Sequence, residues 1–284
     1  MLSEVEPRPR RVAVGEFDGV HLGHREVIRG NDTVLTFEPH PLAVIRPEAA
    51  PRLLTSLDAK IELIAGLGVQ ELVVIPFDER FAAQTPEEFI EQVLVGRLCA
   101  THVSVGENFR FGHGATGDTA MLFADGRFAT RVVELVEVDG EIVSSSHIRG
   151  LVAAGDVAHA AHFLGSPFQV RGEVVTGDRR GRELGFPTAN IVPSEELVCP
   201  GHGVYAARAD GVCAAVSVGV RPTFGTGRAV LVEAFVIDRD EDLYGRILRI
   251  DFIARLRGER RFETVEALVA QMALDVEQTR RLCG

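Results

Sequence analysis

The chain has 284 residues, 46% of them hydrophobic, which is enough for one large domain or two ordinary ones. Its formal net charge of −11 argues against a broad nucleic-acid surface, because phosphate backbones are bound by clustered lysine and arginine. No run approaches the roughly 18 apolar residues of a membrane span. We therefore expect neither a nucleic acid nor a membrane as a partner, and the oligomeric state stays open.

The cysteines and lysines narrow the class of protein further. The acidic start lacks the basic and apolar regions of a signal peptide, and the 4 cysteines are scattered without a C-x-x-C pair, a pattern typical of reduced thiols in a cytoplasmic protein. Lys60 is the only lysine in the sequence, and it does not follow a glycine-rich loop. A Walker A loop is therefore excluded, and a lysine Schiff base is disfavoured.

The first predicted element is a short buried strand at residues 11–15, of the kind found in parallel sheets covered on both faces. It runs into a glycine-rich turn in which Gly15, Gly19 and Gly23 allow sharp bends and the close approach of a ligand. A helix that begins near Gly23 would direct unpaired N–H groups back at this turn, which favours a bound phosphate.

Two histidines, His21 and His24, follow in the same turn and can donate hydrogen bonds to phosphoryl oxygens. Taken alone, a His-x-x-His pair also fits a helix surface or half of a metal site. The preceding strand, the glycines and Asp18 favour a site for nucleoside triphosphate chemistry.

The stretch Gly15-x-Phe-Asp-Gly-Val-His-x-Gly-His24 resembles the HxGH signature of the nucleotidyltransferase superfamily. In this form it resembles the N-terminal module of the bacterial bifunctional riboflavin kinase/FAD synthetase family. The resemblance implies a Rossmann-like domain in which His21 and His24 stabilise the charged transition state. It also implies that four residues of the turn contact the nucleotide or its phosphates: Gly15, Phe17, Asp18 and Gly23.

After the histidine pair, the sequence leaves only about two turns of helix before a second strand at residues 33–37. The resembled family is expected to have a longer helix here. Either this helix is truly short, or a segment is missing near Gly30 and Asn31.

The sequence Glu38-Pro-His-Pro41 follows the second strand. Because ligands of open α/β sheets lie beyond the carboxyl ends of the strands, His40 is placed for a ligand contact, although an ordinary loop fits as well. The resembled family's motif implies that His40 lies near the flavin.

Strands and helices then alternate. A helix is expected at residues 55–67, capped by Thr55 and with Leu57, Ile61 and Ile64 as its buried stripe. A strand at 72–76, a helix entered through Thr85-Pro-Glu-Glu88 and running over 89–98, and a strand at 102–106 follow. This alternation predicts a doubly wound parallel sheet.

The loop after the fourth strand contains Asn108, Phe109 and Phe111 between glycines. Such a loop can stack a flat ring, or its two aromatic residues can anchor it to the core. It resembles the family motif G-x-(N/H)-F-x-F-G, which implies that all three residues belong to the flavin-binding part of the adenylyltransferase site.

A fifth strand at residues 131–136 and a hairpin around 139–140 lead to Ser144-Ser-Ser-His-Ile-Arg149 at a helix start. The serines fit simple helix caps, and they also fit a triphosphate clamp together with the arginine. The segment resembles the family form S-S-T-x-(I/V)-R, which implies that Ser145, Ser146 and Arg149 contact ATP. His159 and His162, on a helix beginning near residue 156, are interpreted as ordinary helix residues.

The pattern changes at residues 165–167, so we predict two domains, 1–165 and 166–284. Short strands are expected at residues 168–175, 203–209, 212–218, 231–237 and 247–255, with one helix at 264–282. Strands at this spacing predict a small antiparallel β-barrel.

The loop at residues 177–190 is rich in glycine and arginine, a composition that favours phosphate binding. It resembles the riboflavin kinase signature G-(R/K)-x-L-G-(F/Y)-P-T-A-N. By that resemblance Gly181 belongs to the nucleotide-binding loop, and Thr188 and Asn190 hold Mg²⁺ and the phosphates of ATP.

Glu233 is a single carboxylate in the apolar run 230–235 and is expected to face the core, which is costly without a function or a partner. The resemblance implies that Glu233 is the catalytic base and that Arg260 contacts the flavin.

The resemblance extends from about residue 11 to 282 and implies two reactions. Riboflavin is phosphorylated by ATP to FMN, and FMN is then adenylylated by ATP to FAD with release of pyrophosphate. The implied partners are the small molecules riboflavin, FMN, FAD and ATP, with Mg²⁺ as cofactor. The alternative is that only one activity is retained, the kinase alone if the short first helix impairs the N-terminal site. Two further alternatives are a flavin-binding module without catalysis and a tRNA-linked enzyme, and the second predicts a lysine-rich loop that this sequence lacks.

Overall fold

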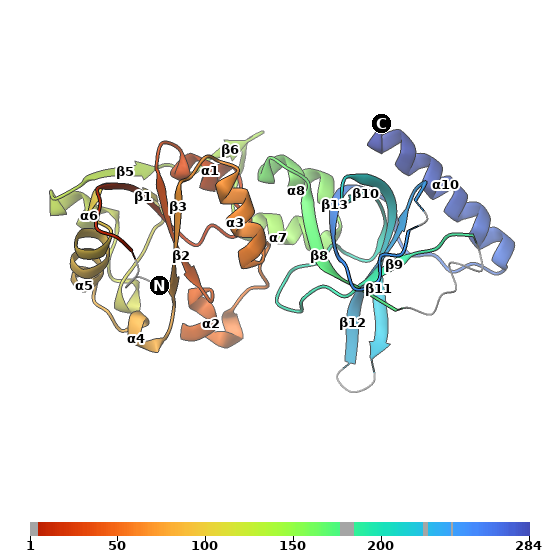
Figure 1. Ribbon diagram of the computed structural model, residues 1–284, viewed down its shortest axis with the longest axis horizontal. Helices are drawn as coiled ribbons and strands as arrows, with labels where there is room; N and C mark the ends of the chain where they lie inside the picture. Colours follow the sequence, from red (N-terminus) through yellow and green to blue (C-terminus); the bar gives the residue numbers. More distant parts are fainter. Residues whose placement is uncertain (1–4, 177–184, 224–226, 240) are drawn as a thin grey trace. The chain divides into compact units, whose positions relative to one another are not determined.

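The computed structural model describes residues 5–176, 185–223, 227–239 and 241–284. The chain folds into two compact units, Met1–Ser145 and Ser146–Gly284 (Figure 1). The domain boundary expected near residue 165 stays a prediction, because the two helices between residues 145 and 164 belong almost entirely to the second unit.

The first unit is built on a five-stranded sheet in the order β3-β2-β1-β4-β5, and all neighbouring strands are parallel. Its strands are β1 (Arg10–Val14), β2 (Thr33–Glu38), β3 (Glu71–Pro76), β4 (Ala100–Gly106) and β5 (Ala129–Val133). A two-stranded hairpin of β6 (Glu137–Val138) and β7 (Glu141–Ile142) follows. The predicted parallel sheet and hairpin are confirmed.

Helices cover both faces of this sheet. They are α1 (Leu22–Ile28), α2 (Pro41–Ile45), η2 (Pro47–Ala49), α3 (Leu57–Ala65), α4 (Glu79–Ala82), α5 (Pro86–Glu88), η3 (Phe89–Arg97), η4 (His113–Ala115) and α6 (Thr119–Asp125). On β1, Val12 belongs to a core cluster with residues of η3 and α6, whereas Ala13 belongs to a second cluster with residues of α1 and α3. Successive strand residues point to opposite faces, so the two clusters lie on the two sides of a doubly wound sheet.

The first helix is short and is followed directly by a turn. α1 has seven residues and ends in a turn in which the Asn31 N–H donates to the Ile28 carbonyl at 3.0 Å, with Gly30 at a φ of 78°. The Asn31 side chain also donates to the Val27 carbonyl at 3.0 Å. The chain therefore passes from α1 to β2 through one tight turn, and whether a segment is missing from the sequence at this point stays open.

Two expectations for helices of the first unit are corrected. The N-cap of α3 is Ser56, whose hydroxyl accepts from the Ala59 N–H, whereas the Thr55 hydroxyl contacts the turn after β1. Ile61 is 41% exposed, whereas Lys60 is 4% exposed, so the buried stripe of α3 includes the lysine. The capping box of Thr85 and Glu88 is confirmed, but the helix continues from residue 89 as a π-helix.

The second unit is a closed antiparallel barrel with three helices in the part of it that the structure describes. The helices are α7 (Ser145–Ala154), α8 (Val157–Leu164) and α10 (Val265–Cys283). The strands follow the order β10-β11-β12-β9-β8-β13 and are β8 (Phe168–Val175), β9 (Ala189–Ile191), β10 (Gly203–Ala209), β11 (Val212–Thr223), β12 (Gly227–Val236) and β13 (Ile247–Arg257). The predicted barrel and C-terminal helix are confirmed, and β9 is a strand that the sequence pattern did not predict.

Candidate functional sites

Three of the motifs lie at one edge of the parallel sheet. The residues after β1, after β2 and after β4 follow the carboxyl ends of neighbouring strands. The strand order reverses between β1 and β4, since the chain passes outward to β3 before it returns to β4 beside β1. Ligands of doubly wound sheets bind outside the carboxyl ends at such a point.

The turn after β1 folds back on itself around a buried phenylalanine. Phe17 has a φ of 51° and is 1% exposed. A Cβ atom at Gly15 would meet the Phe17 ring at 3.1 Å, so a side chain at this position would crowd the ring. Because glycine has no Cβ atom, the Phe17 ring can pack directly against the backbone of the turn at Gly15.

The two histidines are stacked on each other above Phe17. The His21 and His24 ring centroids are 3.5 Å apart with an angle of 17° between the planes, and His24 meets the Phe17 ring edge to face at 5.4 Å. His21 is the N-cap of α1, and its Nδ1 accepts a hydrogen bond from the His24 N–H at 3.2 Å. A ring nitrogen that accepts carries no proton, so the N–H of a neutral His21 is on Nε2.

Asp18 contacts the protein chain rather than open space. It is 3% exposed, and its carboxylate accepts from the Leu54 N–H at 2.8 Å and the Thr55 N–H at 3.1 Å. The Thr55 hydroxyl accepts from the Gly19 N–H at 3.1 Å, and the Ser145 hydroxyl donates to the Asp18 carbonyl at 3.0 Å. These contacts fix the turn, and a direct contact between Asp18 and a nucleotide stays a prediction.

A second carboxylate in this turn, Glu16, was not predicted from the sequence. Its Oε2 atom is shielded from solvent and has no hydrogen-bond partner among the residues that the structure describes. The pKa of Glu16 is raised to about 8, mainly by burial; the Lys60 charge opposes this shift, and the charges of Asp18 and Glu38 add to it. A carboxylate between Val14 and Phe17 in an otherwise apolar strand end was the signal available in the sequence.

The residues expected at the flavin have mixed environments. His40 is the N-cap of α2, where its Nδ1 accepts from the Leu42 N–H at 3.2 Å. Phe109 stacks on Phe111 at 5.6 Å, and Phe111 is 7% exposed and packs on Phe89 in the core. Phe111 therefore anchors the loop, which leaves Phe109 and the exposed Asn108 as the ligand candidates of this motif.

Two of the three expected ATP contacts on α7 fall in the second unit. Ser146 is exposed, and its hydroxyl oxygen accepts from Arg149 Nη1 at 3.3 Å. Their role at the adenylyl-transfer site stays a prediction. Gly181 lies outside the described residues.

The barrel has a cavity of its own, about 270 Å³ in volume, between its outer face and α10. The lining combines apolar residues with a few polar ones: Phe186, Thr188, Val204, Ala215, Val216, Ser217, Glu233, Phe235, Arg257, Leu268, Met272, Asp275 and Val276. A mostly apolar cavity with a few polar groups is the usual form of a small-molecule site.

Glu233 faces this cavity, so the expectation that it faces the barrel core is corrected. On β12 its neighbours Val232 and Ala234 are fully buried, whereas Glu233 is half-buried. Thr188 lines the same cavity, and Asn190 on β9 is the register partner of Glu233. Arg260 is exposed in the segment before α10.

The oxygen atoms near Glu233 fit a hard divalent cation. Thr188 supplies a hydroxyl oxygen and Asn190 an amide oxygen, and Mg²⁺ prefers such ligands. The Asn190 amide nitrogen lies 3.5 Å from the Thr188 carbonyl, so the two residues lie close together.

A doubly wound sheet with a histidine-bearing turn, followed by a barrel with a separate cavity, defines a two-site protein of the nucleotide-dependent transferase class. Residues 3–147 match the family model described as FAD synthetase, and residues 164–283 match the model described as riboflavin kinase. The chain belongs to the bifunctional riboflavin kinase/FMN adenylyltransferase family.

Curated relatives agree with this assignment, and a solved structure shares the fold. The Bacillus subtilis bifunctional riboflavin kinase/FMN adenylyltransferase is 35% identical, with 95% of this chain and 91% of the relative aligned. The Escherichia coli K12 protein of the same name is 36% identical over 96% and 92% of the two chains. A crystal structure titled macrolide-efflux protein from Streptococcus pneumoniae superposes with a TM-score of 0.88 at 28% identity, over 98% of this chain and 96% of that one. In the described part of this chain, no helix combines the length and hydropathy needed to cross a bilayer.

Proposed function

We propose that this chain makes FAD from riboflavin in two steps, a kinase reaction in the barrel and an adenylyl transfer at the parallel sheet. The observation that carries the proposal is that both family models match within one chain, nearly all of which aligns with bifunctional relatives. Consumption of ATP in both steps supports a place in the cytoplasm.

In the kinase step, Glu233 takes the proton from the terminal ribityl hydroxyl of riboflavin. The resulting oxygen attacks the γ-phosphorus of ATP, and the bond to the ADP oxygen breaks. The position of Glu233 in a cavity shared with Thr188 supports this role, because a general base has to reach the proton that it removes. Positioning supplies most of the acceleration in phosphoryl transfer.

Thr188 and Asn190 would hold Mg²⁺ beside this reaction. When bound, the ion would neutralise negative charge on the phosphates. Thr188 is half-buried and Asn190 is buried, and only Ala189 separates them in the sequence. Their closeness along the chain supports the assignment of both oxygen atoms to one ion.

In the second step, a phosphate oxygen of FMN attacks the α-phosphorus of ATP, and pyrophosphate leaves. The attacking phosphate is already ionised and needs no strong base. We therefore assign His21 and His24 to stabilisation of the charge that develops in the transition state. Ser145, Ser146 and Arg149 are assigned to the phosphates of the same ATP.

The proposal is tested by incubating the protein with riboflavin, ATP and Mg²⁺ and separating FMN from FAD by chromatography. Both products are expected. Glu233→Gln keeps the shape of the side chain but removes the base, so FMN formation should fall by about 10²–10⁴-fold. Supplied with FMN directly, this variant should still make FAD.

Three outcomes would contradict parts of the proposal. If the protein forms FMN but no FAD, it has only the kinase activity, which is the single-activity alternative. Normal FMN formation by Glu233→Gln would show that Glu233 is not the general base. Loss of both reactions in a folded Glu233→Gln protein contradicts the separation into two sites.

A further inference from the structure

The two halves of α10 meet the barrel in different ways. In the second half, Asp275, Thr279 and Cys283 recur every four residues and are 5%, 0% and 6% exposed. Cys283 Sγ lies 3.5 Å from the Ala207 carbonyl of β10, which fixes the helix end against the barrel. This half of α10 is a packed anchor.

The first half of α10 lies over the cavity instead. Leu268 and Met272 have the same four-residue spacing, but they are only half-buried, and both line the cavity, which extends along the helix as far as Asp275 and Val276. A cavity removes packing partners from its lining, so these residues do not by themselves set the distance between helix and barrel.

A buried ion pair joins α10 to the barrel where the two halves meet. Arg257, the last residue of β13, donates from Nε to both Asp275 carboxylate oxygens at 3.1 Å and from Nη2 to Oδ2 at 2.8 Å. The two side chains are 17% and 6% exposed. The Gln271 amide, one turn earlier on α10, donates to Asp275 Oδ1 at 2.9 Å.

This pair is a wall of the cavity as well as a link. Arg257 and Asp275 both line it, together with Glu233. The Arg257 guanidinium also lies 5.7 Å from the Phe262 ring centroid, in the segment that leads into α10. A planar guanidinium in a two-bond contact with a carboxylate fixes orientation as well as distance, which a lysine cannot do.

We propose that Arg257 and Asp275 are positioning residues for the flavin: the pair holds the first half of α10 at the separation from the barrel at which the flat ring system fits and its ribityl chain reaches Glu233. This inference rests on the kinase activity proposed for the barrel. Neither residue takes part in the phosphoryl transfer itself.

The first test is a steady-state comparison of full-length Arg257→Lys and Asp275→Asn with the unchanged protein. In both variants kcat/KM for riboflavin should fall by about tenfold to a hundredfold, the usual cost of a misplaced substrate. KM for ATP should stay within about twofold, since uniform binding of the nucleotide is not altered. Formation of FAD from supplied FMN, measured in the same samples, should be unchanged.

Thr279→Val is the matched control. Thr279 is fully buried on α10, donates to the Asp275 carbonyl at 2.8 Å, and does not line the cavity. Loss of this hydrogen bond should lower the thermal unfolding midpoint and leave kcat/KM for riboflavin unchanged. An equal fall of kcat/KM in Thr279→Val would overturn the proposal, because the pair would then act only through stability.

A second measurement separates this inference from the kinase proposal. Binding of riboflavin is followed by quenching of its fluorescence, which needs no turnover. Weaker binding in Arg257→Lys than in Thr279→Val supports the positioning role even if the unchanged protein makes no FMN. Equal riboflavin affinity and equal kcat/KM in Arg257→Lys and the unchanged protein would overturn it.

Discussion

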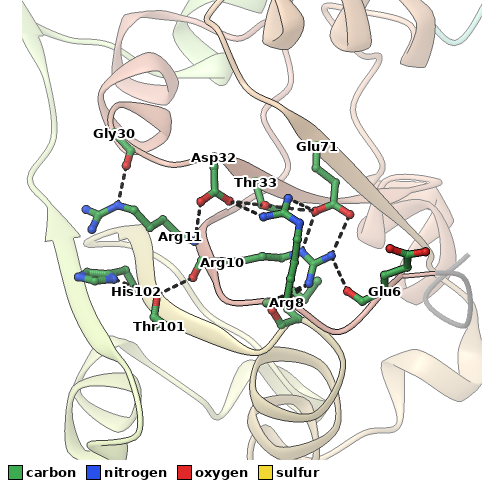
Figure 2. A network of polar contacts seen from close by, with 11 residues as sticks. Glu6, Arg8, Arg10, Arg11, Gly30, Asp32, Thr33, Glu71, Thr101 and His102 are labelled. Carbon is green, nitrogen blue, oxygen red and sulfur yellow. Dashed lines mark hydrogen bonds and ion pairs between the residues drawn. The ribbon is translucent and has the colours of Figure 1, made fainter.

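The two edges of the parallel sheet differ in how their polar groups are used. At the amino edge, where β1, β2 and β3 begin, Arg10 is 1% exposed and binds Glu71 through Nε at 2.7 Å and Nη2 at 3.1 Å (Figure 2). Thr33 at the start of β2 also reaches Glu71, at 3.4 Å, so the network crosses three strands. The remaining Arg10 donors bind the carbonyls of Glu6, Arg8 and Leu98.

The charges of the amino edge stabilise each other. The hydrogen bond with Arg10 lowers the pKa of Glu71, and the same contact raises the pKa of Arg10. At the carboxyl edge the opposite holds, because burial raises the pKa of Glu16 to about 8 and its Oε2 has no hydrogen-bond partner in the part of the chain that the structure describes.

This difference separates the part of the sheet that holds the fold from the part that is available to a ligand. A saturated network fixes the starts of three strands, whereas the other edge carries a carboxylate of raised pKa and a stacked histidine pair. Substitutions at the carboxyl edge should therefore change activity more than stability, and substitutions at the amino edge should do the reverse.

The largest expected effect is on activity at the carboxyl edge. His24→Ala removes one of the two stacked rings, and FAD formation from supplied FMN should fall by about 10²–10⁴-fold. FMN formation from riboflavin should continue, so FMN accumulates. If His24→Ala forms FAD at a rate within a few-fold of the unchanged protein, His24 does not stabilise the transition state.

The next effect is on stability at the amino edge. Glu71→Ala leaves the buried Arg10 charge without its carboxylate, which typically costs about 3–5 kcal/mol in the free energy of unfolding. Denaturant unfolding measures this loss, and FAD formation by the folded fraction should be unchanged.

Arg8→Ala is the control for Glu71→Ala. Arg8 also binds Glu71, at 2.7 Å, but its side chain is 40% exposed, so its removal should cost only about 0–1 kcal/mol. An equal loss in both variants would show that burial of Arg10 does not set the cost.

The third effect concerns Glu16 and appears only when the pH is changed. Its pKa is raised in the folded protein from 4.5 to about 8, so between these values the folded state holds a proton that the unfolded state releases. Stability should therefore fall as pH rises from about 4.5 to 8. Glu16→Gln cannot ionise and should lack this fall, so its stability relative to the unchanged protein should rise steadily as pH increases toward 8.5.

Unfolding curves of both proteins at several pH values test this prediction. The two proteins should have similar stability at pH 4, where the carboxyl is protonated in both states. Parallel pH profiles would show that Glu16 is not the group that titrates.

Local pattern predicted most of the fold. β8 and β10 begin and end at the predicted residues, because alternation and turn residues are local signals. β9 was missed since its three residues carry no period and are defined only by pairing with β8 and β12. The predicted N-cap of α3 was wrong by one residue, because Thr55 binds Asp18, which is distant in the sequence.

The sites were less predictable where tertiary contacts determine which way a side chain points and which residue it meets. Glu233 was assigned to the wrong face, since a strand covered by the barrel interior and by α10 is apolar on both sides and its faces look alike. The role of Glu16 and the pairing of Arg257 with Asp275 depend on residues brought together by the fold, and no spacing in the sequence indicates them. The histidine turn was readable because its glycines and histidines are all local.

The burial of Lys60 has a practical consequence. It holds the only side-chain amine in the sequence, and it is 4% exposed on α3. An amine-reactive acylating reagent reaches this nitrogen only when the structure around α3 opens. The rate at which one peptide gains the mass of the reagent therefore reports how often this part of the molecule opens, without any engineered label.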